Sequence, residues 1–232
     1  MPIDVTERAV SLRVISYYQP DPRNTTGMMT PRELYERSAG QHVYNWRTLY
    51  GVILHGTVGR DTLTYWLTGG SMSGPNAPYS MAHFLALRDR NTLAKMCPTN
   101  KSCNHCGNSD WHDPAVSQPL NSYFLGIECE DLQNWNRGSN AQRITDDQVI
   151  KCALVWAYES ALDHQTKGAA SKAEDRYVLH HSQIALPWGR RSDPDAGLFN
   201  DDLFWHVVTK IRRAENWPNF WPTRWVGSSP DV

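Results

Sequence analysis

The feature that most constrains the fold is a series of short, apolar, β-prone segments, each too short for a helix. Val52-Ile53-Leu54 is the clearest of them, and it runs directly into His55. The other segments with this character are residues 84–87 and 92–96, which suggest a hairpin around 89–91, and residues 123–129 and 177–180. This pattern predicts a sheet of several short strands.

The clearest helix signal begins at Thr145. Thr145 and Gln148 form a capping box, and the two aspartates between them suit the positive end of a helix dipole. We therefore predict a helix from Thr145 to about His164, and a final helix over residues 201–214. Strands and helices interleave without strict βαβ repetition, which predicts an α/β fold with a central mixed β-sheet flanked by helices.

The length of the chain, 232 residues, suits one domain with elaborations. Residues 1–45 contain scattered prolines and one short helix candidate over 30–38, in which Thr30 is the cap and Pro31 takes the first helical position. We therefore predict an N-terminal elaboration packed on the core over residues 1–45 and the main domain over residues 46–232.

Charge and hydropathy exclude some classes of partner. The 23 basic and 24 acidic side chains nearly cancel, so no overall field attracts nucleic acid or anionic lipid. Charged residues interrupt the apolar patches near the start, and no run is long enough to span a bilayer. We expect no nucleic-acid partner, no membrane insertion, no signal peptide and synthesis in the cytoplasm. The odd number of cysteines, five, favours reduced thiols over a disulfide framework.

Two histidine positions and one aspartate have the pattern of a metal site. His55 ends one predicted strand, the pair His180-His181 ends another, and Asp193 follows after a loop. Adjacent strand residues point to opposite faces, so only one histidine of the pair can face the metal. Two imidazoles and one carboxylate leave a fourth tetrahedral position open, which is the ligand count of a catalytic zinc.

Glu128 is the candidate for proton transfer. It lies late in the predicted strand 123–129, among apolar neighbours, so burial should raise its pKa or a specific partner should hold it. A salt-bridged core glutamate is the alternative interpretation. Next to a metal site, a general base is the interpretation that we favour.

A family resemblance rests on five sequence blocks that occur in order between about residues 50 and 205. The blocks are Val52-Ile-Leu-His55-Gly-Thr, Ser80-Met-Ala-His83-Phe, Asn104-His105-Cys-Gly107-Asn-Ser109, Leu125-Gly-Ile-Glu128, and His181-Ser-Gln-Ile-Ala185 continuing through Arg190-Arg-Ser-Asp193-Pro194. Together they resemble the type 2 N-acetylmuramoyl-L-alanine amidases, which share the peptidoglycan recognition protein fold and include phage endolysins and cytoplasmic muropeptide-recycling enzymes.

The resemblance implies a zinc ion, Zn2+, in a surface groove at one sheet face. Its ligands would be His55, His181 and Asp193, and spacing to the Ile184-Ala185 pair favours His181 over His180. Glu128 would be the general base, and Arg191 would stabilise the oxyanion at a position where similar members have lysine.

The resemblance also implies contacts with peptidoglycan, the expected partner, meaning a glycan strand with its stem peptide. His105, Asn108 and Trp111 are similar to groove residues that bind the sugar and the peptide, and Trp111 is the candidate for stacking on a sugar. Some phage members carry a catalytic tyrosine where this chain has Ala82, which gives Glu128 more weight. We expect a monomer.

Three cysteines and a histidine allow a second metal as an alternative. Cys97, Cys103, Cys106 and His112 have spacing that could hold a structural zinc. Small buried thiols that pack like alanine are the interpretation that we favour, and a disulfide is expected least.

The biological role follows from the resemblance alone. We expect hydrolysis of the bond between N-acetylmuramic acid and L-alanine, with cell-wall lysis by a phage endolysin as the first reading. A cytoplasmic recycling amidase, a non-catalytic peptidoglycan-binding module of the same fold, and a metal hydrolase with another substrate are the alternatives.

Overall fold

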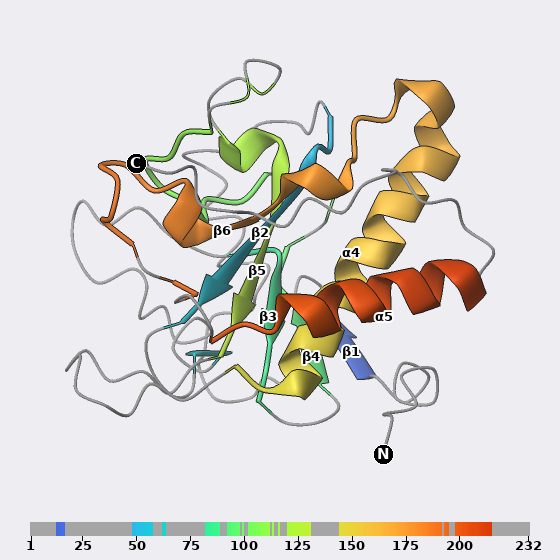
Figure 1. The fold of residues 1–232 in the computed structure, drawn as a ribbon, viewed down its shortest axis with the longest axis horizontal. Helices are drawn as coiled ribbons and strands as arrows, with labels where there is room; N and C mark the ends of the chain where they lie inside the picture. The colour runs from blue at the N-terminus through green and yellow to red at the C-terminus, as the bar shows by residue number, and fades with distance from the viewer. Residues whose placement is uncertain are drawn as a thin grey trace.

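The computed structural model describes residues 13–16, 48–57, 62–63, 82–88, 92–97, 99, 102–111, 113, 116, 120–130, 144–191, 193–194 and 198–214. Its centre is a six-stranded sheet with the strand order β1-β4-β3-β5-β2-β6. The strands are β1 (Arg13–Ser16), β2 (Gly51–Gly56), β3 (Phe84–Ala86), β4 (Thr92–Lys95), β5 (Phe124–Cys129) and β6 (Val178–His180). Figure 1 shows these strands beside the two long helices.

The sheet is mixed, as the sequence predicts. Strand β2 pairs in parallel with both β5 and β6, and β3 is parallel to β5. Strands β3 and β4 form the predicted antiparallel hairpin. β1 pairs in parallel with β4, so part of the N-terminal segment extends the sheet. The division at residue 45 stays a prediction, and the helix expected over 30–38 lies outside the described residues.

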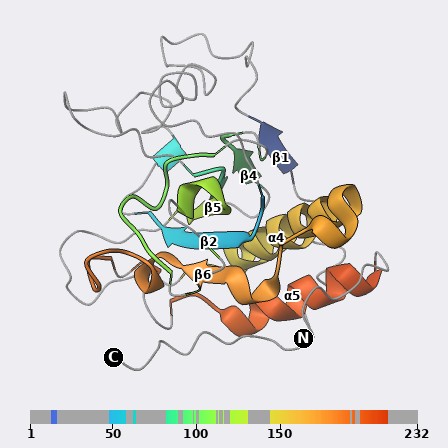
Figure 2. The same cartoon turned by 90° about the horizontal axis from the view of Figure 1, so that it is seen from above.

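Two helices, α4 (Asp146–Lys167) and α5 (Asp201–Ala214), pack against each other and cover the same face of the sheet. Figure 2 shows them side by side. The side chain of Thr145 accepts a hydrogen bond from the backbone N–H of Gln148, and the Gln148 side chain returns one, so the predicted capping box is formed. Helix α4 ends at Lys167, slightly beyond the predicted end. Neither helix is long and apolar enough to cross a lipid bilayer.

Side chains of β2 and β5 alternate between two apolar clusters. Val52 and Leu54 face the helices, whereas Ile53 faces the opposite cluster, in which residues of loops and 3₁₀ turns pack against the strands. The turns of 3₁₀ helix are η2 (Leu120–Ser122), η3 (Gly168–Ala170), η4 (Asp175–Tyr177) and η5 (His181–Gln183). By the same alternation, His55 and Glu128 belong to the face away from the helices.

Candidate metal centre

The predicted site residues gather at the carboxyl ends of three adjacent parallel strands. His55 lies near the end of β2, and its register partner on β5 is Glu128. His181 follows β6 directly, on the other side of β2. Parallel strands end at the same edge of a sheet, so residues distant in sequence meet there.

Three side chains at this edge, His55, His181 and Asp193, could hold a metal ion. Their ligand atoms all lie within 4.8 Å of one another. The Oδ2 atom of Asp193 is 3.0 Å from Nδ1 of His181 and 3.7 Å from Nδ1 of His55. Both histidines are buried, and the backbone N–H of Ser182 donates to the Asp193 carbonyl at 2.9 Å, which holds the aspartate next to His181.

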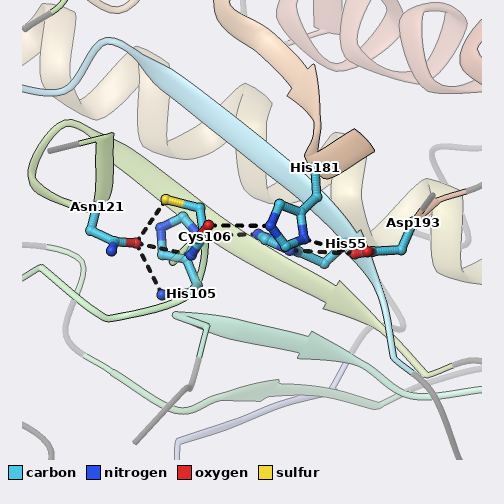
Figure 3. Close-up of polar contacts among 6 residues, drawn as sticks. All are labelled: His55, His105, Cys106, Asn121, His181 and Asp193. Atoms are coloured by element: carbon cyan, nitrogen blue, oxygen red, sulfur yellow. Dashed lines mark hydrogen bonds and ion pairs between the residues drawn. The ribbon is translucent and has the colours of Figure 1, made fainter. Parts of the chain in front are cut away.

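The Nε2 atoms of His55 and His181, the ring nitrogens that point away from Asp193, already have hydrogen-bond partners. Nε2 of His181 lies 3.3 Å from the carbonyl oxygen of Cys106, which can only accept, so this nitrogen carries the proton. Nε2 of His105 donates to the Phe124 carbonyl at 3.1 Å, which leaves Nδ1 of a neutral His105 to accept from Nε2 of His55 at 3.0 Å. Figure 3 shows Asp193 on one side of the two ligand rings and these partners on the other. Both Nδ1 lone pairs therefore face Asp193.

The electrostatics of this arrangement favour a cation among the three side chains. Burial, with the charge of His181, lowers the pKa of His55 to about 4, which opposes a proton there at neutral pH. Burial alone would raise the pKa of Asp193, but the close contacts with His181 and His55 lower it well below its ordinary value. Two nitrogen lone pairs and a carboxylate repel one another unless a cation lies between them. Two imidazoles and a carboxylate suit zinc, so the residues fit the ion.

Glu128 is half-buried beside this cluster. Burial and the negative charge of Asp193 together raise the pKa of Glu128 to about 8, although the positive charge of Arg191 opposes the shift. Within the described part of the chain, the carboxylate has no hydrogen-bond or ion-pair partner. The alternative of a salt-bridged core glutamate therefore finds no support there, whereas a carboxyl group with a raised pKa next to a metal site suits proton transfer.

Arg191 lies at the exposed rim of the site. Its positive charge lowers the pKa values of both His55 and Glu128, which places it within electrostatic reach of the cluster. Its predicted role at the oxyanion stays a prediction.

His180 points away from the cluster. Its Nε2 lies 3.1 Å from Oδ1 of Asp201 at the start of α5, and its ring meets Phe199 edge-on. The structure therefore brings His181, and not its neighbour, to His55 and Asp193, in agreement with the alternation of strand side chains.

His105 lies behind His55, and its predicted contact with the substrate stays a prediction. The residue is 3% exposed, and both ring nitrogens are bonded inside the protein, to His55 and to the Phe124 carbonyl. The ring supports His55 from behind.

Asn108 and Trp111 lie nearer the surface. Asn108 is exposed, and its backbone carbonyl accepts hydrogen bonds from the Leu186 N–H at 3.0 Å and from Arg190 at 2.8 Å. Trp111 is half-buried and packs against the apolar cluster that includes Cys106 and Ile184. Their predicted contacts with sugar and peptide stay predictions.

The cysteine cluster differs from expectation. Cys97 and Cys103 form a disulfide, the outcome expected least from the sequence. The two cysteines are only six residues apart in the sequence, and the fold places their thiols in contact just after β4. The number of cysteines in the chain does not reveal this contact. Cys106 is a free, buried thiol, and His112 lies outside the described residues. A structural zinc would therefore lack two of its four expected ligands, because the disulfide uses the thiols of Cys97 and Cys103.

Two contacts at the site went unpredicted. The Cys106 carbonyl bonds His181, and Asn121 holds the backbone at Cys106. A backbone acceptor leaves no mark in a sequence. The only available signal for Asn121 is an amide side chain just before a buried strand.

A mixed sheet that brings two histidines and a glutamate from the ends of parallel strands together with an aspartate from a following loop is the arrangement expected of a metal-dependent hydrolase. Residues 45–196 match the family described as N-acetylmuramoyl-L-alanine amidase (Amidase_2). Because this match spans more than half of the sequence, the chain belongs to that family of enzymes. Among curated protein sequences, none matches the chain.

Solved structures show the same fold. AmpD, as a selenomethionine derivative, superposes with a TM-score of 0.50 at 20% identity, over 85% of this chain and 94% of AmpD. AmpDh3 from Pseudomonas aeruginosa gives 0.50 at 18% identity, over 86% and 75% of the two chains. The endolysin amidase LysCS from Clostridium intestinale URNW gives 0.45 at 13% identity, over 89% and 97%. At such low identities the first two likenesses concern the fold alone.

Proposed function

We propose that the chain is a zinc-dependent amidase that cleaves the bond between N-acetylmuramic acid and L-alanine in peptidoglycan and thereby lyses the cell wall. Family membership supports the reaction. The observation that carries the zinc dependence is the convergence of His55, His181 and Asp193 donor atoms within 4.8 Å, beside the register partner Glu128. A pure binding module has no need of an open three-ligand site next to a carboxyl group with a raised pKa.

Each residue has a defined task in this proposal. His55, His181 and Asp193 hold the ion, which supplies a Lewis acid for the amide carbonyl and lowers the pKa of water. Glu128 takes a proton from the attacking water as the new carbon–oxygen bond forms. Arg191 stabilises the charge that develops on the carbonyl oxygen. Glu128 then gives the proton to the departing L-alanine nitrogen as the carbon–nitrogen bond breaks.

Purified sacculi and the zinc-loaded protein test this proposal. We expect stem peptides with a free L-alanine amino group, detected by amino-terminal labelling and mass spectrometry. Glu128→Gln should lower the rate by roughly 10²- to 10⁴-fold, the usual contribution of a general base. Glu159→Gln is the matched control, because Glu159 lies on α4, where it pairs with Lys95 of β4, and is remote from the site. If the sacculi stay intact but retain the bound protein, the proposal of an amidase would be wrong and the protein would be a binding module.

The form of the substrate separates wall lysis from muropeptide recycling. Lysis requires that cross-linked sacculi are cut at rates comparable to those for soluble anhydro-muropeptides. A strong preference for the soluble fragments would favour the recycling amidase and contradict the lytic role.

A further inference from the structure

We propose that Asn121 is a positioning residue for the metal site, because it fixes the dipeptide His105-Cys106 that orients both histidine ligands. Asn121 touches neither His55 nor His181 itself, so it acts through the dipeptide. The inference rests on the proposed function in one respect, namely that His55 and His181 bind zinc.

The Asn121 side chain holds the backbone of the dipeptide. Its Oδ1 accepts hydrogen bonds from the backbone N–H groups of His105 and Cys106, each at 3.0 Å, and from the Cys106 thiol at 2.9 Å. Its Nδ2 donates to Oδ1 of Asn104 at 3.1 Å. Asn121 belongs to η2, the turn directly before β5, so the dipeptide is tied to the strand that carries Glu128.

Each residue of the dipeptide holds one ligand, as Figure 3 shows. The His105 ring accepts from Nε2 of His55 at 3.0 Å, and the Cys106 carbonyl accepts from Nε2 of His181 at 3.3 Å. Both contacts place the proton on Nε2 and direct Nδ1 toward Asp193. One asparagine therefore controls the tautomer and the ring orientation of two ligands that lie far apart in sequence.

Packing fixes the His105 ring in the same position. The ring lies so close over β5 that a Cβ atom at Gly126 would be 2.5 Å from its Cγ. The ring also donates to the Phe124 carbonyl at 3.1 Å. Only glycine at position 126 leaves room for this ring, so Gly126→Ala displaces His105 without removing a polar group.

Zinc affinity tests the inference on the full chain. We expect Asn121→Ala to weaken zinc binding by about 10-fold or more, measured by competition with a chromogenic chelator, because partners behind metal ligands usually contribute 10- to 100-fold. Asn121→Asp keeps the accepting oxygen and should restore most of the affinity. Asn200→Ala is the matched control: its Oδ1 also accepts a backbone N–H, from Leu203 at 3.1 Å, but at the start of α5. Its zinc affinity should equal that of the unchanged protein.

Two further measurements separate positioning from general stability. The visible absorption spectrum of the Co²⁺-loaded protein should change in Asn121→Ala and in Gly126→Ala, and it should not change in Asn200→Ala. Thermal unfolding of the metal-free variants reports any loss of stability on its own. If Asn121→Ala fails to fold, Gly126→Ala provides the same test through His105.

The outcomes have distinct meanings. Unchanged zinc affinity and an unchanged cobalt spectrum in Asn121→Ala, or in Gly126→Ala where that variant replaces it, would overturn the positioning role, even if metal-free stability falls. Failure of the unchanged protein to bind zinc would overturn both this inference and the proposed function. Zinc binding and sacculus cleavage that survive undiminished in the variants would leave the function standing and remove only the role of Asn121.

Discussion

Glu128 stands out at the residue scale because its surroundings oppose its charge. Burial raises its pKa to about 8, so in the metal-free protein the carboxyl group holds its proton at neutral pH. A divalent cation at His55 and Asp193 adds positive charge nearby, which lowers the pKa of a carboxyl group. A bound metal ion would therefore favour the ionised form of Glu128, which the proposed role as a proton acceptor requires.

The raised pKa of Glu128 predicts a pH dependence of metal-free stability. The folded protein binds the Glu128 proton up to about pH 8, whereas the unfolded chain releases it near 4.5, so stability falls as pH rises between these values. His55 acts in the opposite sense from about pH 4 to 6.5, because its folded pKa is lowered. In the window from pH 6.5 to 8, the proton of Glu128 therefore acts without the opposing effect of His55.

Urea unfolding in the presence of a chelator measures this effect. Across that window we expect the free energy of unfolding to fall by at most about 1.4 kcal/mol per pH unit, the limit for one proton. Glu128→Gln should flatten the slope. The difference between the two proteins cancels every other titrating group, so equal slopes would contradict the raised pKa.

The two neighbouring histidines give a second prediction at this scale. His181→Ala should abolish stoichiometric zinc binding, because it removes one of three ligands. His180→Ala should retain zinc, because that ring contacts Asp201 and Phe199. Equilibrium dialysis with metal analysis measures both variants, and metal loss only from the His180 variant would reverse the assignment.

At the scale of elements, a buried polar network joins the two helices to the turn before β6. Arg212 of α5 donates two hydrogen bonds to Asp175 of η4, at 2.7 and 2.8 Å, and Trp156 of α4 donates to the same carboxylate at 2.8 Å. All three side chains are buried. The network fixes the start of β6 and therefore the approach of His181.

Breaking this network should be costly. Asp175→Asn removes the negative charge that faces the buried Arg212 guanidinium, and we expect a loss of about 3–5 kcal/mol in the free energy of unfolding. Lys167→Ala is the matched control, because it removes an exposed ion pair with Asp163 one helical turn away and should cost no more than about 0.5 kcal/mol. Denaturant titration compares them. A similar small loss for both variants would mean that the buried pair contributes little.

The elements were predictable where local signals decide them. The capping box at Thr145, the hairpin around 89–91 and the limits of α5 all follow from neighbouring residues. The pairing of β1 with β4 was not predicted, because it joins segments far apart in the chain. The place of His105 was missed for the same reason: its partner His55 lies 50 residues away, and no periodicity records such a contact.

At the scale of the whole molecule, the candidate metal ligands join separate parts of the fold. His55 ends β2, His181 follows β6, and Asp193 comes from the loop beyond. An ion bound to all three cross-links these segments in the folded state only. It should therefore stabilise the whole domain by mass action.

Zinc should raise the free energy of unfolding in proportion to its affinity. At a free zinc concentration 100 times the dissociation constant, the expected gain is about 2.7 kcal/mol. Asp193→Ala should remove most of the gain. Denaturant unfolding in zinc buffers, with and without a chelator, measures it, and identical curves would argue against a site formed only on folding.

The support of the ligands and the rim of the site are separate structures. His105 and Cys106 hold the ligand rings from behind, whereas Asn108 and Arg190 bond to each other at the exposed front. Sequence changes in the exposed front loops can therefore alter contacts with the substrate and leave the support of the ligand rings unchanged. Exchanging these front loops between relatives should therefore change the preference for the substrate before it changes the geometry of the candidate metal ligands.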